Sequence, residues 1–314
     1  MTEDSATLPI VLRAMNQALA RVNDDLAIDT AEHHANVMVL GLPRSGTTLA
    51  TQVLFENMDL ACTNNLMARF WMAPLVGCCV SRAVVGNRKG SAYKSDYGKT
   101  DLPWEPHEFS WFWHDLLGLQ DRGLSEYPCP DSIDWPRVHR RICAINNCLS
   151  SPVVHKPLEH VGFYLREFAR LFCRTLFVYI DRSPIDVACS IARARLKHGG
   201  NTEFWYSTEL PDRAAMSLAK ERPYWVQIAA QVSGLRAMYE DRLCLLSDSR
   251  VVRVQYEDLV RRPIDLLEQV RTKTRYLGAE IAVTRDPGAI RPSNPEPDHT
   301  LVELLIRGFD ALRP

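Results

Sequence analysis

The sequence lacks several features that would place it in a broad class. It has no run of the ~18 or more consecutive apolar residues that a membrane-spanning helix needs. It has no excess of either charge, because 37 Lys and Arg are balanced by 38 Asp and Glu, for a formal net charge of −1. Residues 1–6 are acidic and polar, unlike a signal peptide. We therefore expect a cytoplasmic protein without a transmembrane segment or a nucleic-acid partner, in which any basic site is local.

Metal-binding and disulfide patterns are also missing. None of the nine cysteines forms a Cys-x-x-Cys pair, and the histidines and cysteines are not spaced as zinc ligands are. In the absence of a secretory signal, we expect the cysteines to be reduced and mostly buried. The sequence therefore predicts no metal site.

Strands and helices alternate along the 314 residues, which predicts parallel β-α-β units. The expected fold class is α/β, with a P-loop-type parallel sheet flanked by helices. No linker divides the chain, so we expect one domain over 1–314 with an inserted substrate-binding region at about 65–150. Residues 60–100 are predicted to be irregular. Strands are predicted at 37–40, 152–156, 175–180 and 251–255, and helices at 8–29, 45–57, about 161–172, from 184, at 214–246 and at 263–277.

The most informative segment follows the first predicted strand and reads Gly41-Leu-Pro-Arg44-Ser45-Gly46-Thr47-Thr48. A strand, a glycine-bounded loop and a helix start direct backbone N–H groups toward one point, which suits a phosphate. The spacing is that of a nucleotide-binding P-loop, but Thr47 stands where the lysine of that motif belongs. That lysine reaches the terminal phosphates of ATP, so its absence favours a phosphate-anchored donor other than a nucleoside triphosphate.

A second candidate anchor follows the strand predicted at 175–180. Arg182 lies at its carboxyl end, where open α/β sheets bind ligands, and Ser190 lies two turns into the next helix. Arginine can bind a phosphate with two hydrogen bonds and serine can add a hydroxyl donor. Ser183 and Asp186 form a pattern like a capping box at the start of that helix.

Both anchors resemble motifs of the sulfotransferases. The Pro-Arg-Ser-Gly-Thr-Thr loop is similar to the loop with which this family binds the 5′-phosphosulfate end of 3′-phosphoadenosine-5′-phosphosulfate (PAPS), and an Arg followed eight residues later by Ser is its 3′-phosphate motif. Residues 254–259 resemble a strand end of the family, and Lys156 resembles a lysine that precedes the helix before the 3′-phosphate strand. The resemblance covers about 36–260.

The resemblance implies transfer of a sulfuryl group from PAPS to a hydroxyl or, less favourably, an amine, by in-line displacement and without a metal. The acceptor would be a small molecule, a carbohydrate or a lipid, and the product would be adenosine 3′,5′-bisphosphate. Lys156 would lie near the transferred group. Arg291 is a candidate for the basic C-terminal loop that closes the 3′-phosphate site in the family, although the usual Arg-Lys-Gly sequence is absent. The implied donor-binding residues are Arg44, Ser45, Gly46, Thr47, Thr48, Arg182, Ser190 and Arg291.

The general base is open on the sequence, since residues 62–65 hold no carboxylate where related enzymes carry a glutamate. Glu108 ranks first, because a carboxylate among aromatic residues should have a raised pKa, which suits a base near neutral pH. His107 ranks second and His155 third. The alternative is that His107 and Glu108 simply begin a helix.

Three further points stay open on the sequence. Aromatic residues at 104–113 and at 205–206 are candidates for an acceptor pocket or, more ordinarily, for the core. Residues 197–201 have the composition of a mobile loop or lid. The alternatives to a sulfotransferase are a P-loop kinase of small molecules and a nucleotide-binding protein without catalysis.

Overall fold

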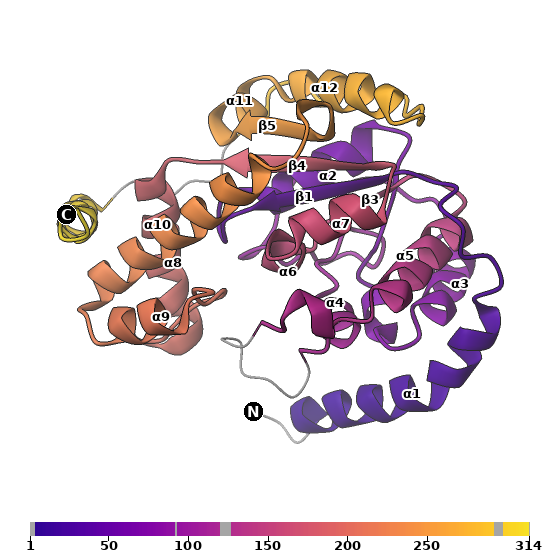
Figure 1. Ribbon diagram of the computed structural model, residues 1–314, viewed down its shortest axis with the longest axis horizontal. Coiled ribbons are helices and arrows are strands. Elements are labelled where there is room, and N and C mark those ends of the chain that lie inside the picture. The colour runs from indigo at the N-terminus through magenta and orange to yellow at the C-terminus, as the bar shows by residue number, and fades with distance from the viewer. Residues whose placement is uncertain (1–3, 92, 120–126, 292–297, 314) are drawn as a thin grey trace.

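The computed structural model describes residues 4–91, 93–119, 127–291 and 298–313 (Figure 1). Their central element is a five-stranded sheet with strand order β2-β3-β1-β4-β5, in which every neighbouring pair is parallel. The carboxyl ends of all strands therefore meet at one edge. The strands are β1 (Asn36–Gly41), β2 (Ala61–Cys62), β3 (Val153–His155), β4 (Thr175–Asp181) and β5 (Val251–Gln255).

Strands β1 and β4, which are neighbours in the sheet, are buried on both faces, which explains their continuous apolar sequence. Successive side chains of a strand point to opposite faces. Accordingly, Met38 and Leu40 of β1 belong to one apolar cluster, while Val37 and Val39 belong to the other. This burial of both faces holds β1 in the centre and places its last residue, Gly41, at the middle of the sheet's carboxyl edge.

Helices cover both faces of the sheet. Figure 1 shows α12 on one side and α6 and α7 on the opposite side, with α1 near the edge that carries α3 and α5. No helix among the described residues is both long enough and apolar enough to cross a bilayer. The α-helices are α1 (Asp4–Leu26), α2 (Thr47–Asn57), α3 (Pro74–Val84), α4 (Ser110–Leu117), α5 (Trp135–Leu149), α6 (Leu158–Gly162), α7 (Leu165–Leu171), α8 (Pro184–Gly199), α9 (Arg213–Lys220), α10 (Tyr224–Leu243), α11 (Tyr256–Arg261), α12 (Pro263–Tyr276) and α13 (His299–Asp310). Short 3₁₀ helices occupy Met67–Phe70, Pro130–Ser132 and Asp248–Arg250.

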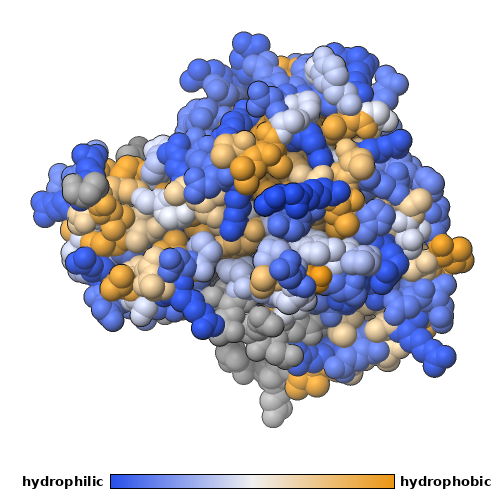
Figure 2. All heavy atoms as spheres, in the orientation of Figure 1, coloured by the Kyte–Doolittle hydropathy of each residue, from blue (hydrophilic) through white to orange (hydrophobic). Residues whose placement is uncertain are grey.

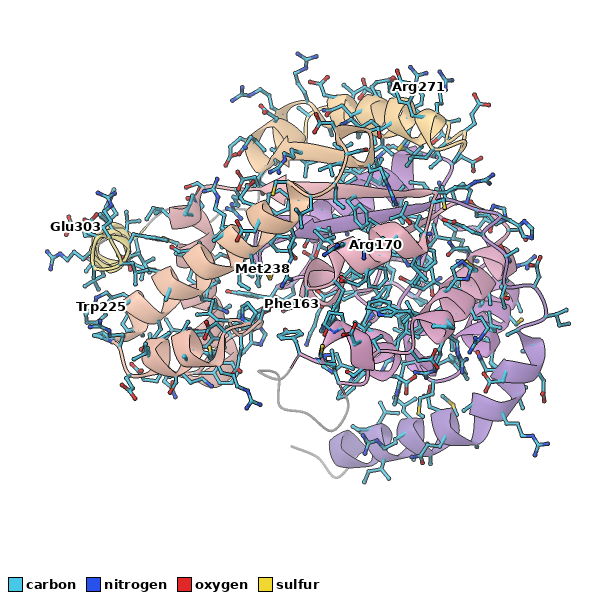
Figure 3. The ribbon with its side chains drawn as sticks, viewed as in Figure 1. Phe163, Arg170, Trp225, Met238, Arg271 and Glu303 are labelled. Carbon is cyan, nitrogen blue, oxygen red and sulfur yellow. The ribbon has the colours of Figure 1, made fainter. Side chains whose placement is uncertain are left out.

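The outer faces of the helices follow ordinary amphipathic rules. Helix α12 buries Leu266, Leu267 and Val270 against the sheet, and the surface above it is mainly hydrophilic (Figure 2). In Figure 3, Arg271 of α12 and Glu303 of α13 lie on outer faces, whereas Met238 of α10 lies toward Phe163 in the interior; both of the latter are buried.

The predicted strands and the α/β class are confirmed, but several helix predictions are wrong. The helix expected around 161–172 is two helices, since α6 ends at Gly162 and α7 begins at Leu165. Gly162 packs so closely on Tyr239 that an added Cβ would lie 2.6 Å from its hydroxyl. The region at 214–246 breaks before α10, since Pro223 cannot continue a helix. Ser183 is the N-cap residue of α8, but its side chain makes no cap hydrogen bond. Helix α3 lies within the stretch predicted to be irregular.

The prediction of mostly buried cysteines is also wrong in part. All nine are free thiols, as expected, but only four are buried, four are exposed and Cys148 is half-buried.

Candidate functional site

The loop after β1 is held in a conformation that requires glycine at its end. Gly46 has φ +105°, and an added Cβ would lie 2.5 Å from the ring of Tyr256, so a side chain there would displace that ring. Helix α2 begins at the next residue without a side-chain cap. The first N–H groups of a helix have no partner within it, so here they are available to an anion at the sheet edge.

The two candidate phosphate anchors lie side by side. The guanidinium of Arg182 donates from Nη1 to the backbone carbonyl of Arg44 at 3.0 Å. Arg44 in turn donates from Nε to the hydroxyl of Ser190 at 3.1 Å. The Arg182 guanidinium also stacks 4.3 Å from the centre of the Tyr256 ring, the same ring that packs on Gly46. The parallel register of β1, β4 and β5 makes this contact possible, since it brings their carboxyl ends together.

Lys156 lies beneath the site, behind residues that it holds together, and does not itself line the cavity. Its side chain is almost fully buried, at 1% exposure, and its Nζ donates to Thr48 Oγ1 at 2.7 Å, to Glu108 Oε1 at 2.8 Å and to the carbonyl of Gly98 at 3.1 Å. A buried ammonium needs such partners, because leaving it unpaired in the interior is costly. Thr48 of α2, Lys156 after β3 and Glu108 therefore form one polar cluster.

The predicted raised pKa of Glu108 is wrong. Burial does act to raise the pKa of this carboxyl, but the charge of Lys156 and its hydrogen bond outweigh burial and lower the pKa below the ordinary 4.5. The sequence placed Glu108 among aromatic residues but could not show that the ammonium of Lys156 lies against it. Glu108 is consequently a carboxylate, and ready to accept a proton, throughout the neutral range.

The two alternative bases are neutral and lie outside the cavity lining. Burial lowers the pKa of His107 to about 4, and its Nδ1 accepts a hydrogen bond from the backbone N–H of Phe109 at 2.8 Å. Burial lowers the pKa of His155 to about 3, its ring packs against Trp113, and neither ring nitrogen has a hydrogen-bond partner in the described part of the chain. Of the three candidates, Glu108 is the one that lines the cavity.

A cavity of about 360 Å³ opens over these groups at the carboxyl edge of the sheet. Its lining contains five basic residues and two acidic ones, so the cavity favours an anion. Ser45 is absent from the lining: its side chain is fully buried, and its backbone N–H donates to the carbonyl of Leu42. The basic residues are Arg44, Lys99, Arg182, Arg193 and Arg291, and the acidic ones are Asp96 and Glu108.

Sequence reasoning missed the segment that covers the cavity, residues 93–99, here called the cover segment. The ring of Tyr97 has the guanidinium of Arg44 4.7 Å from its centre and the ammonium of Lys197 at 4.6 Å. Gly98, at φ +92°, directs its carbonyl to Lys156. Two tyrosines and a glycine close together were the only signal in the sequence.

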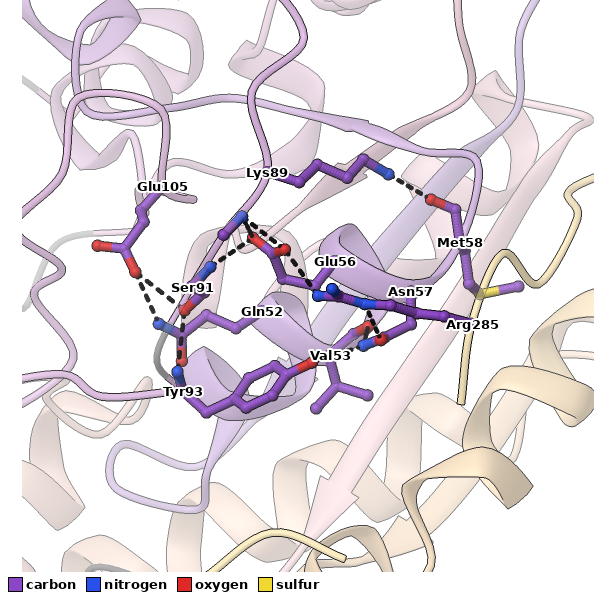
Figure 4. A network of polar contacts seen from close by, with 11 residues as sticks. Gln52, Val53, Glu56, Asn57, Met58, Lys89, Ser91, Tyr93, Glu105 and Arg285 are labelled. Carbon is purple, nitrogen blue, oxygen red and sulfur yellow. Dashed lines mark hydrogen bonds and ion pairs between the residues drawn. The ribbon is translucent and has the colours of Figure 1, made fainter. Parts of the chain in front are cut away.

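The cover segment is anchored by the network in Figure 4. The buried carboxylate of Glu56 accepts the N–H groups of Gly90 and Ser91 at 2.7–2.9 Å, and Asn57 donates to the hydroxyl of Tyr93 at 2.8 Å. Arg285 donates to both Glu56 and Asn57, which ties the chain that leads to Arg291 to the same helix, α2. The network therefore positions two walls of the cavity from one helix.

Two other missed or misjudged elements complete the lining. Arg193 enters the cavity one helical turn after Ser190, a spacing that could have revealed it. Residues 197–199, predicted as part of a lid, are the last turn of α8. Within the aromatic cluster, Phe109, Phe112 and Trp113 are core, whereas Tyr206 lines the cavity.

Comparison with known proteins agrees with the architecture. No protein-family profile matches the chain, and no curated protein is significantly similar to it. Among solved structures, sulfotransferase STF1 from Mycobacterium tuberculosis H37Rv is 16% identical with a TM-score of 0.53, over 96% of this chain and 83% of that one. Sulfotransferase STF9 from Mycobacterium avium is 14% identical with a TM-score of 0.49, over 96% and 73%. With a five-stranded parallel sheet that matches the first of these structures, the chain has the fold of the sulfotransferases.

Proposed function

We propose that the protein is a sulfotransferase that transfers the sulfuryl group of PAPS to a hydroxyl group of its acceptor. The observation that carries this proposal is the pair of adjoining anion sites, in which Arg182 bonds to Arg44 and Arg44 bonds to Ser190. A donor with phosphates at both its 3′ and 5′ positions requires two such sites, whereas AMP requires one. The likeness in fold to STF1 supports the same class of reaction.

The residues of the cavity fit such a donor. The free N–H groups at the start of α2, with the hydroxyls of Thr47 and Thr48, would hold its 5′-phosphate. Arg182 and Ser190 would hold the 3′-phosphate, and Arg193 and Arg291 line the same cavity and add positive charge. Arg44 stands between the two groups and would neutralise both.

The transfer step requires a group that accepts the proton of the attacking hydroxyl. It also requires positive charge near the leaving phosphate. PAPS supplies an activated sulfuryl group when bound. Glu108, a carboxylate at neutral pH, would accept the proton of the attacking hydroxyl. Lys156, bonded to Thr48 of the phosphate loop, would offset the negative charge that grows on the leaving phosphate. The same ammonium keeps Glu108 ionised, so one cation serves both groups.

We propose that residues 65–150 bind the acceptor and form an insertion into a single sulfotransferase domain. This stretch supplies Glu108 and the cover segment, both of which line the cavity. A small-molecule, carbohydrate or lipid hydroxyl fits this arrangement. A P-loop kinase is less favoured, because Thr47 replaces the lysine that its chemistry needs.

Calorimetric titration with adenosine 3′,5′-bisphosphate and with AMP tests the proposal. We expect much tighter binding of the bisphosphate, and Arg182→Ala should weaken it by about 1.5–3 kcal/mol, the range for hydrogen bonds to a charged group. Arg253→Ala, which removes a surface arginine paired with Glu240, is the matched control and should bind as the wild type does. Equal affinity for the two nucleotides would rule out PAPS as the donor.

A further inference from the structure

Three cysteines from two helices meet on the side of the molecule where α3 packs on α5. Cys78 and Arg82 of α3 are four residues apart and so share one face of that helix. From this face, Nη1 of Arg82 donates to the backbone carbonyl of Cys148, in the last turn of α5, at 2.7 Å. The bond holds the end of α5 against α3. The Cys148 thiol also shares side-chain hydrogen bonds with the thiols of Cys78 and Cys79, which makes the three thiols direct neighbours.

The three thiols differ in access to solvent. Cys78 is buried in the apolar cluster on that face of the sheet, Cys148 is half-buried at the edge of the same cluster, and Cys79 is exposed. A small oxidant in solution can therefore reach Cys148, while Cys78 lies behind it. Such an arrangement separates a thiol that reacts first from a protected thiol that reacts with it afterwards.

The pKa values of Cys148 and Cys78 are shifted in opposite directions, which agrees with their different access to solvent. A hydrogen bond from Cys78 lowers the pKa of Cys148 to about 6, against the effect of burial, and Cys79 and the positive Arg82 contribute further. The same hydrogen bond, together with burial, raises the pKa of Cys78. The shared hydrogen bond therefore favours the thiolate on Cys148 and disfavours it on Cys78. Accessible thiolates beside a second thiol are typical of cysteines that peroxides oxidise.

We infer that Cys148 and Cys78 form a redox site at which hydrogen peroxide produces a disulfide. The Cys148 thiolate attacks one peroxide oxygen; an S–O bond forms, the O–O bond breaks, and hydroxide leaves to become water. Cys78 then attacks the sulfur of the sulfenic acid; the S–S bond forms, the S–O bond breaks, and a second water leaves. The two sulfurs lose two electrons and the peroxide gains them. This site is separate from the donor cavity and does not depend on the proposed function.

Peptide mapping of the peroxide-treated full chain under non-reducing conditions tests the assignment. We expect a linked pair of peptides that contain Cys78 and Cys148, with the loss of two hydrogen atoms. Cys148→Ser and Cys78→Ser should abolish the link, and the matched variant Cys79→Ser should retain it. A link through Cys79, or oxidation of Cys148 to sulfinic acid without any link, would overturn the proposal. If a variant fails to fold, the wild-type map still decides between these outcomes.

A second measurement needs no oxidant. At pH 7, iodoacetamide should alkylate Cys148 about tenfold faster than Cys244, because the hydrogen bond from Cys78 favours the Cys148 thiolate, which is the reacting form. Cys244 is a fair reference, since it is exposed and its thiol donates to the carbonyl of Asp241 within its own turn. Equal rates at the two thiols would contradict the assignment of Cys148 as the reactive group.

Discussion

At the scale of single residues, the contact between Lys156 and Glu108 is central to the proposed transfer. Their 2.8 Å contact pairs an ammonium that is 1% exposed with a carboxylate that is partly exposed. A pair of this kind contributes little net stability against apolar replacements, but loss of one member leaves a buried charge behind. In the proposed reaction, the pair would keep Glu108 charged as the base and hold the ammonium of Lys156 beside Thr48.

Glu108→Gln should lower turnover about 10²–10⁴-fold, because the amide cannot accept the proton that a positioned carboxylate accepts. Affinity for adenosine 3′,5′-bisphosphate should stay close to that of the wild type. The assay uses labelled PAPS with an acceptor found by screening metabolite extracts, and Glu240→Gln, on the surface, is the control. We expect full wild-type activity down to about pH 5, since the pKa of Glu108 is below 4.5. A loss of activity centred well above pH 5 would instead show that another group is the base.

At the scale of elements, α2 organises the site from both of its ends. Its first turn faces the cavity with free N–H groups, and its last turn carries Glu56 and Asn57, which hold the base of the cover segment and the chain leading to Arg291. A shift of this helix would consequently move three walls of the cavity together.

Glu56→Gln should destabilise the protein by about 2–4 kcal/mol, because a buried carboxylate with several charged hydrogen bonds would lose its charge. Residues 89–94 should also become more sensitive to trypsin, since Lys89 and Lys94 lie at the base of the cover segment. Unfolding by guanidinium chloride and limited proteolysis measure the two effects. Glu240→Gln, in an exposed ion pair, should change stability by less than about 1 kcal/mol. An unchanged digestion pattern would show that Glu56 does not anchor the segment.

At the scale of the whole molecule, buried histidines set the response of stability to acid. Burial lowers the pKa of His107 and His160 to about 4 and of His155 to about 3, from an ordinary 6.5. Between these values and 6.5 the unfolded chain binds more protons than the folded one, so stability rises with pH in that window. Their contribution is complete above pH 6.5 and declines as the pH falls toward 4.

We expect the free energy of unfolding to be lower at pH 5 than at pH 7.5, with a slope of about 1.4 kcal/mol per pH unit for each proton taken up on unfolding. His155→Leu should flatten this slope, because it removes a buried group that has no polar partner among the described residues. His33→Gln, at an exposed position, should leave the slope as it is. Urea titrations at several pH values provide the data, and an unaltered slope in His155→Leu would refute the assignment.

How far the sequence predicts this molecule depends on the range of each interaction. The strands and the phosphate loop follow from local signals: apolar runs, Gly41 and Gly46, and the Arg182 to Ser190 spacing. The close packing of Gly162 on Tyr239 and the lowered pKa of Glu108 beside Lys156 rest on contacts that no local pattern contains. The cover segment was missed for the same reason, since Glu56 and Asn57 hold it across more than thirty residues of chain.

The parallel sheet also affects how the protein folds during its synthesis on the ribosome. Asn36 of β1 pairs with Val153 and Thr175, both synthesised more than a hundred residues later. Sheets built from such distant partners form slowly. The glycine loop is among the first parts to be translated, but the cavity above it is complete only after Arg291 has been synthesised, because that residue belongs to its lining.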